Sequence, residues 1–153
     1  MKAVLQRVSE ASVRVDGSVV GSCGEGLMIL LGVADGDTDR DAVLLAEKIA
    51  KLRIFCDDVG KMNRSVKDID GEALVISQFT LLANYRHGNR PDYMASAPVS
   101  EANRLYELFV SLMKKELRRV ECGIFGADMK VSLVNDGPVT ICMDSDVLKG
   151  KAQ

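Results

Sequence analysis

The segment Gly26-Leu27-Met28-Ile29-Leu30-Leu31-Gly32-Val33 decides the fold of this 153-residue chain. Together with Ala34 it is the longest apolar run, and it has about half the length that a membrane-spanning helix needs. The dipeptide Asp35-Gly36 follows it as a turn signal. An uninterrupted apolar run between turn signals is typical of a strand that is covered on both faces. We therefore expect residues 27–33 to lie at the centre of a sheet.

Short strands precede this segment, and a helix follows it. The pattern predicts strands over residues 3–8 and 12–15, and Asp16-Gly17 is a hairpin signal before a strand at 18–20. Apolar residues then recur at helical spacing between residues 38 and 53. We expect this helix to cover the sheet.

Alternating aspartates between residues 35 and 41 allow two interpretations. A calcium-binding EF-hand loop begins with such a pattern, but this chain has Arg40 where that loop needs glycine and Ala46 where it needs glutamate. Acidic side chains also favour a helix N-terminus, and Thr38-x-x-Asp41 is typical of a capping box. The second interpretation is favoured.

The C-terminal half contains one more helix and three more strands. The predicted elements are a strand at 73–79, a loop through Pro91 and Pro98, a helix from about Ser100 to Leu117, and strands at 129–134 and 139–143. The order of all elements predicts a single α+β domain with mostly antiparallel sheets and two main covering helices. No alternation of strands and helices indicates a doubly wound nucleotide-binding sheet. The domain is expected to span residues 1–144, and residues 145–153 to form a flexible C-terminal tail.

Composition excludes several classes of protein. The chain is 47% apolar and 27% charged, as is usual for a globular domain. Lys and Arg total 20 against 22 Asp and Glu, and the net charge of −2 is unlike that of a basic nucleic-acid-binding domain. Arg7 interrupts any apolar leader, so we expect a cytoplasmic protein without a membrane segment.

The cysteines and the histidine give no sign of a metal site or a catalytic triad. Cys23, Cys56, Cys122 and Cys142 lie far apart, so we expect reduced thiols, no bound metal and no other cofactor. His87 is the only histidine, and it lies in a loop where an imidazole is poorly oriented for a Ser-His-Asp mechanism. A solvated histidine or a substrate contact is the alternative.

Ser77-Gln78-Phe79-Thr80 lies where a predicted strand ends. Hydroxyl, amide and backbone N–H groups at such a place can face a ligand, although a plain strand end with two exposed hydroxyls has the same pattern. Residues 73–91 contain no Asp or Glu but do contain Arg86, His87 and Arg90. This local positive charge suits contact with phosphate.

Asn135-Asp136-Gly137-Pro138 also has two interpretations. It can be a hairpin turn between the last two strands. Alternatively, glycine leaves backbone bare to an approaching group, and a cis Gly-Pro unit would hold its carbonyl in one direction.

These two segments, each extended to Ser77–Leu81 and Asn135–Thr140, resemble the two signature motifs of the D-aminoacyl-tRNA deacylase family. Further matches, in the order of the family, are Gln6-Arg7-Val8, Gly60-Lys61-Met62-Asn63, Asn89-Arg90-Pro91 and Phe125-Gly126-Ala127-Asp128-Met129. The resemblance covers the chain from Met1 to about Asp144. The segment Asn84-Tyr85-Arg86-His87 departs from the usual basic loop of the family, with His87 where a lysine is common.

The resemblance implies a homodimeric α+β hydrolase with a barrel-like core. Its substrate would be the ester between a D-amino acid and the terminal ribose of tRNA, and it would also cleave glycyl-tRNA mischarged on tRNA(Ala). L-amino acids would be rejected by a Gly-cisPro unit that reaches into the site of the other subunit. That role would fall to Gly137 and Pro138, held in place by Arg7.

The remaining site residues follow from the same resemblance. Ser77–Thr80 would bind the amino group and the ester, Met129 would contact the substrate, and Arg86, His87 and Arg90 would contact tRNA. Water, assisted by the ribose 2′-hydroxyl, would attack the ester, so the family needs neither a protein base nor a cofactor. Thr80 as a nucleophile is the alternative.

Two functions of other classes are alternatives to the deacylase. A non-catalytic RNA-binding module could use Arg86 and Arg90, but three Tyr, four Phe and no Trp supply little stacking surface. A small dimeric interaction domain without chemistry is the other. Turnover of a D-aminoacyl ester distinguishes both from the enzyme.

Overall fold

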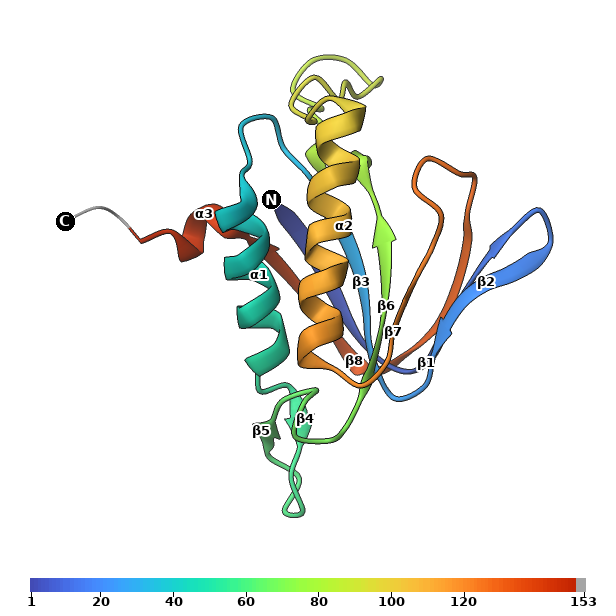
Figure 1. The fold of residues 1–153 in the computed structure, drawn as a ribbon, viewed down its shortest axis with the longest axis vertical. Helices are drawn as coiled ribbons and strands as arrows, with labels where there is room; N and C mark the ends of the chain where they lie inside the picture. Colours follow the sequence, from blue (N-terminus) through green and yellow to red (C-terminus); the bar gives the residue numbers. More distant parts are fainter. Residues whose placement is uncertain (151–153) are drawn as a thin grey trace.

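A curved, mixed sheet with two long helices against it forms the framework of this α+β fold (Figure 1). The computed structural model describes residues 1–150. In chain order the elements are β1 (Lys2–Val15), β2 (Ser18–Cys23), β3 (Gly26–Gly32), α1 (Asp39–Lys51), β4 (Phe55–Cys56), β5 (Met62–Arg64), β6 (Glu72–Ser77), the 3-10 helix η1 (Phe79–Leu82), α2 (Val99–Glu116), β7 (Val120–Cys122), β8 (Lys130–Asp144) and α3 (Ser145–Leu148).

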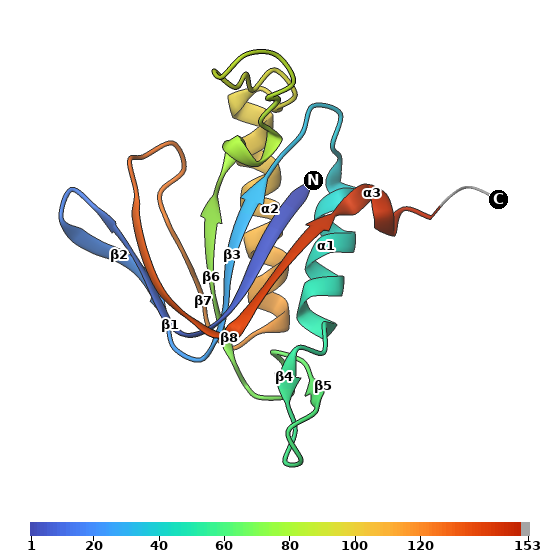
Figure 2. The same ribbon diagram turned by 180° about the vertical axis from the view of Figure 1, so that it is seen from behind.

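The main sheet has the order β2-β1-β3-β6-β7, and β8 pairs with β1 outside this path. The two ends of the order come together, because the backbone N–H of Ser22 in β2 donates to the Glu121 carboxylate in β7 at 2.6 Å. The sheet is therefore a nearly closed, barrel-like structure, as expected. Helices α1 and α2 cover one face of it, and Figure 2 shows the opposite side.

The expectation of mostly antiparallel pairing is corrected, because the sheet is mixed. β1 pairs antiparallel with β2, β3 and β8, whereas β3–β6 and β6–β7 are parallel. α1 lies in the connection between β3 and β6, and α2 in that between β6 and β7. A helix in the connection lets the next strand run in the same direction. This alternation of strands and helices was not predicted, because further segments of chain separate α1 from β6 and β6 from α2.

The prediction that residues 27–33 form a central strand covered on both faces is confirmed. Leu27, Ile29 and Leu31 of β3 pack into the main core with the buried faces of α1 and α2. Met28 points the other way, into a second apolar cluster with residues of β1 and β6. A side chain at Gly26 would overlap the backbone of Glu72, so the glycine lets these two strands begin side by side.

Two predictions about strand continuity were wrong. Residues 2–15 form one long strand, where two short ones were expected. Residues 130–144 also form one strand, because Asn135 pairs opposite Val8 and Thr140 opposite Gln6 in the same antiparallel ladder. The segment between them is thus a bulge in β8 and not a hairpin turn. β1 and β8 continue past the predicted breaks because they pair with each other from one end to the other.

The start and the end of the described chain meet in a buried ionic cluster. The Met1 ammonium donates to Asp37 at 2.7 Å and to the Ser145 hydroxyl at 2.6 Å. The Asp41 carboxylate accepts from Ser145 and Lys149, both at 2.6 Å. Burial alone would raise the pKa of Asp41, but these hydrogen bonds and those from Thr38 hold it far below its ordinary value. The aspartates at the N-terminus of α1 thus have structural partners.

The packed part of the chain continues past Asp144, where the domain was expected to end. Ser145 is fully buried, and Ser145–Leu148 form α3, which packs on α1. The chain is therefore packed beyond the point where a flexible tail was expected to start. Residues 151–153, the end of that tail, lie outside the described residues. Among residues 1–150, no helix combines the length and hydrophobicity needed to span a membrane.

Candidate active site

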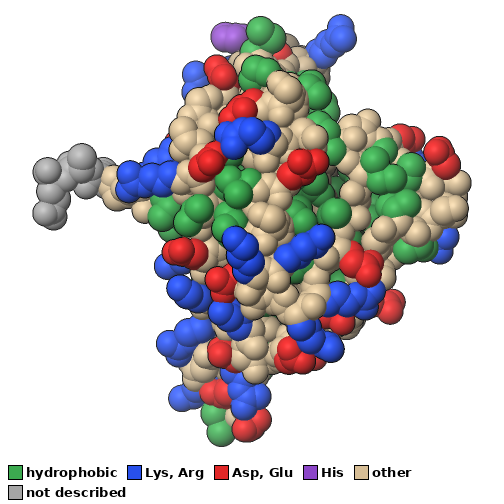
Figure 3. Space-filling view, in the orientation of Figure 1, with side chains coloured by type: hydrophobic (Ala, Val, Ile, Leu, Met, Phe, Trp, Pro, Cys, Tyr) green, Lys and Arg blue, Asp and Glu red, His purple; other side chains and the backbone are tan. Residues whose placement is uncertain are grey.

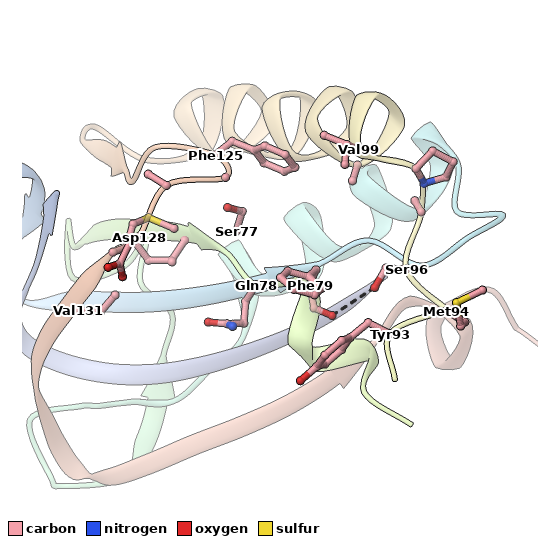
Figure 4. Close-up of a pocket in the computed structure, with 17 residues that line it drawn as sticks. Ser77, Gln78, Phe79, Tyr93, Met94, Ser96, Val99, Phe125, Asp128 and Val131 are labelled. Carbon is pink, nitrogen blue, oxygen red and sulfur yellow. Dashed lines mark hydrogen bonds between the residues drawn. The ribbon is translucent and has the colours of Figure 1, made fainter. Parts of the chain in front are cut away.

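A cavity of about 740 Å³ lies where β6 ends and α2 begins (Figure 4). Its lining residues are Ile76–Phe79, Tyr93, Met94, Ser96–Val99, Ala102, Phe125–Met129 and Val131. We call it the main cavity. Its walls are mostly apolar with a few polar groups, as in sites that bind small organic groups. Three other cavities, of about 350, 620 and 610 Å³, are smaller.

The floor of the main cavity is built by the end of β6. The backbone N–H of Gln78 still donates to Leu31 of β3 at 2.8 Å, and the chain then turns into η1. Phe79, the first residue of η1, is 58% exposed and packs edge-to-face on Tyr93, with ring centroids 5.0 Å apart. The Ser96 hydroxyl donates to the carbonyl of Phe79 at 3.4 Å. The loop before α2 is thereby held against the strand end.

The opposite wall comes from α2 and from the segment that precedes β8. Figure 4 shows Val99 and Phe125 on this side, across the cavity from Phe79 and Tyr93. Phe125 packs on Tyr106 of α2, whose hydroxyl donates to the carbonyl of Val75 at 2.9 Å. Burial raises the pKa of Tyr106, so the phenol stays a neutral donor. These contacts hold α2 at a fixed distance from β6.

The polar groups of the main cavity are few. Ser77, Gln78, Ser96, Asp128 and the phenol of Tyr93 supply the polar side-chain groups of its lining. The Asp128 carboxylate forms an exposed ion pair with Lys130 at 2.8 Å. No histidine lines the cavity among the described residues, so the structure offers no imidazole base there. Chemistry at this site would therefore depend on positioning and on hydrogen-bond donors.

The predicted residues Ser77, Gln78, Phe79 and Met129 are brought together in the main cavity. Thr80 does not line it. Its hydroxyl accepts a short hydrogen bond from the Gln78 side-chain amide. Thr80 is therefore placed to orient Gln78.

Arg7, Gly137 and Pro138 are not part of the main cavity of the same chain. Arg7 lies opposite Leu27, whereas the cavity adjoins the other end of β3 at Leu31, about 13 Å along the strand. The Arg7 guanidinium donates to the carbonyl of Asp136 at 2.9 Å and to that of Ile54 at 2.7 Å. Its Nη2 atom lies so close to Gly137 that a side chain there would be within 2.9 Å of it.

The bulge of β8, residues 136–138, projects from the sheet and is exposed. The peptide bond between Gly137 and Pro138 is cis, as the family resemblance implied. The bulge is closed at its base because Val139 N–H donates to the Asn135 side chain at 3.0 Å. A convex, fixed segment of backbone thus lies far from the concave site.

Arg86, His87 and Arg90, predicted to contact tRNA, are exposed in the loop between η1 and α2. Figure 3 shows positive and negative side chains interspersed over the face of α1 and α2. Residues 85–91 differ from that face, because they contain two arginines and no acidic residue. Arg86 also lines a second cavity beside the main one.

Sequence reasoning did not find the cavity residues from the loop and from α2. Tyr93, Met94, Ser96 and Val99 come from a stretch without a recognised motif. The available signal was Pro91 and Pro98, which bracket a loop too long to be a simple connection. An antiparallel bridge between Ala34 and Ser96 brings this loop to the end of β3. Among the described residues, no group of three or more His, Cys, Asp or Glu side chains could hold a metal ion.

Comparisons with known proteins agree with this arrangement. The family described as D-Tyr-tRNA(Tyr) deacylase matches residues 4–144. A protein of Geobacter sulfurreducens named D-aminoacyl-tRNA deacylase is 57% identical over 145 residues, covering 95% of each chain. One of the same name from Ruegeria pomeroyi is 58% identical over 144 residues, covering 94% of this chain and 99% of its own.

Two solved structures share the fold. The c-Myc DNA Unwinding Element Binding Protein is 41% identical, with a TM-score of 0.89 over 94% of this chain and 98% of its own. A probable eukaryotic D-amino acid tRNA deacylase is 16% identical, with a TM-score of 0.82 over 93% of this chain and 97% of its own. The second likeness concerns the fold alone.

Proposed function

Because the chain belongs to the D-Tyr-tRNA(Tyr) deacylase family, we propose that it hydrolyses the ester bond of D-aminoacyl-tRNA and releases the free D-amino acid and tRNA. The observation that carries this proposal is the main cavity, where the signature segment Ser77–Phe79 forms the floor. The same reaction would remove glycine mischarged on tRNA(Ala). A tRNA substrate also favours a cytoplasmic location.

In the proposed reaction, the end of β6 positions the ester. The first N–H group of a helical turn has no partner within it, so that of η1 at Phe79, which lines the cavity, can donate to the ester carbonyl. Ser77 and Gln78 would contact the substrate amino group and the ester. Water attacks the carbonyl carbon, the bond to the ribose 3′ oxygen breaks, and that oxygen takes up a proton with the help of the 2′-hydroxyl. No protein base is needed, because an aminoacyl ester is already activated.

The proposed selection of D-amino acids uses the bulge of β8. Gly137 and Pro138 would present their carbonyls to the substituent of an L-amino acid and reject it by collision. Glycine has no such substituent, which explains how it could be accepted. These carbonyls lie on fixed backbone because Arg7 holds the bulge in place.

A homodimer would bring the bulge of one protomer to the main cavity of its partner. The distance between the two regions within one chain supports this arrangement, since one chain alone leaves the cavity without the bulge. We expect light scattering to give a dimer under assay conditions. An active monomer would contradict the shared site.

The first test of the reaction compares matched D- and L-tyrosyl-tRNA with the purified, metal-free protein. We expect rapid release of tyrosine from the D ester alone. Tight binding of tRNA without release from either ester would instead support the RNA-binding module.

The shared site is tested with mixed dimers of Gln78→Ala and Gly137→Ala chains. If each site takes its cavity from one protomer and its bulge from the other, a mixed dimer holds one intact site and one with both defects. It should then recover about half of the D-selective activity of the wild type. No recovery would mean that the bulge and the cavity act within one chain.

A further inference from the structure

We propose that a second cavity beside the main one binds the nucleotide that precedes the terminal adenosine of tRNA, with its base stacked on Tyr85 and its phosphate beside Lys2. This loop cavity, of about 620 Å³, is lined by Lys2, Leu82–Arg86, Asp92, Met94 and Ala95. The inference rests on the proposed function, because it assumes that the aminoacyl ester occupies the main cavity.

The two cavities are neighbours. Met94 lines both of them, and it is 87% exposed between them. Residues of the loop between η1 and α2 line both of them, and this loop lies at one end of the molecule (Figures 1 and 2). A single strand whose terminal ribose enters the main cavity can therefore continue over Met94 into the loop cavity.

The ring of Tyr85 is accessible to a base that could stack on it. Its side chain is 80% exposed, which is unusual for a large aromatic residue without a partner. Asn84 and Asp92 exchange backbone hydrogen bonds at 2.9 and 3.0 Å, and their side chains hydrogen-bond at 3.0 Å. This bridge fixes the loop immediately before Tyr85. Unpaired bases of RNA are commonly bound on such exposed aromatic rings.

The charge of the loop cavity suits a phosphate. Lys2 and Arg86 both line it, and neither forms an ion pair within residues 1–150. Its single carboxylate, that of Asp92, already accepts hydrogen bonds from Asn84 and from the N–H of Met94. In a chain with a net charge of −2, two unengaged cations beside an exposed ring make a distinct site for a nucleotide.

The test compares two substrates for each variant, D-tyrosyl-tRNA and the D-tyrosyl ester of adenosine, which lacks all preceding nucleotides. Tyr85→Ala should raise KM for the tRNA about tenfold more than KM for the ester, as expected for one lost stacking contact. Tyr85→Phe keeps the ring and should restore KM for the tRNA. Lys2→Ala should raise the same KM severalfold and make it less dependent on salt. Lys115→Ala, an exposed lysine on α2, is the matched control and should have no effect.

Several outcomes would overturn the subsite. Equal KM changes for the tRNA and the ester in Tyr85→Ala would show that Tyr85 acts on the main cavity or on the fold. No change for either substrate would show that the exposed tyrosine has no role in binding. If the wild type cleaved neither the adenosine ester nor D-tyrosyl-tRNA, the proposed function itself would be wrong, and the subsite with it.

Discussion

The main cavity and the bulge of β8 differ in almost every physical property. The cavity is concave, mostly apolar and built from three segments of chain, within residues 76–79, 93–102 and 125–131. The bulge is convex and exposed, and Arg7 holds it by bonding both the Asp136 carbonyl of the bulge and the Ile54 carbonyl that follows α1. The cavity can enclose a substrate but has few groups to discriminate between enantiomers. The bulge offers rigid backbone but cannot enclose anything by itself.

This difference shows how the two tasks can be separated. Binding and hydrolysis need the floor and walls of the cavity, whereas selection by collision needs only a small, fixed obstacle. Each region can therefore be damaged with little effect on the other. The following variants, in order of decreasing effect on catalysis, test that separation.

Gly137→Ala should have the largest effect. The glycine has φ +135°, which strains any L side chain, and an added Cβ would lie 2.9 Å from Arg7 Nη2 and from Val139 Cγ2, so the bulge or these side chains must shift. A displacement of this kind can lower the efficiency of a reaction about 100-fold. We expect a loss of about this size in the ratio of kcat/KM for D-tyrosyl-tRNA to kcat/KM for L-tyrosyl-tRNA. Gly36→Ala also has a positive φ but open space around it, and should keep the ratio. A wild-type ratio of the two kcat/KM values in Gly137→Ala would contradict the role of the bulge in selection.

Arg7→Lys should reduce the same ratio about tenfold. One ammonium on a flexible stem does not reproduce the rigid fork that reaches both Asp136 and Ile54, so the bulge becomes less fixed. Arg14→Lys, on the same strand, changes a single exposed contact with Gly17 and is the control. Steady-state kinetics on both enantiomers measures the effect. A ratio that is lowered equally by both substitutions would contradict a specific role for Arg7.

Thr80→Ala should retain activity within about tenfold of the wild type. The substitution removes one hydrogen bond to Gln78, which is worth about 1 kcal/mol, and it removes nothing from the cavity lining. Single-turnover deacylation is the measurement. Complete loss of hydrolysis, with the fold and tRNA binding intact, would make Thr80 the nucleophile.

Asp41→Asn should leave kcat/KM unchanged and lower stability. It removes the charge that Lys149 and the Met1 ammonium face in a buried cluster, at a cost of about 2–4 kcal/mol. Because the pKa of Asp41 is lowered in the folded state, its contribution is present above about pH 4 and is lost as the pH falls further. Unfolding by urea between pH 3 and 7 measures this. A variant with wild-type acid sensitivity would contradict the assignment.

Local patterns predicted much of the fold. The apolar run at 27–33 and the two amphipathic helices were found because each signal lies within one element. The parallel pairing was missed because it depends on how distant strands meet, which no short window contains. The long ladder between β1 and β8 was missed for the same reason, since only a neighbouring strand distinguishes a bulge from a turn.

The candidate site shows the same division. Ser77 and Gln78 were found because they form a signature at the end of a strand. Tyr93 and Val99 were not, because they reach the cavity only when their loop packs against β3 and η1. Nor could the sequence show that Arg7 and Gly137 lie far from the cavity of their own chain. Those facts depend on tertiary structure.

The cluster around Asp41 also determines how the molecule opens. The ends of a chain usually fray first and exchange their amide hydrogens rapidly. Here the Ser145 N–H donates to the Met1 carbonyl at 2.9 Å, and the same serine hydroxyl joins Met1 to Asp41 of α1. The amides of β1, α1 and α3 should therefore exchange in one slow, concerted event, so that the first strand and the last helix report on the same opening reaction.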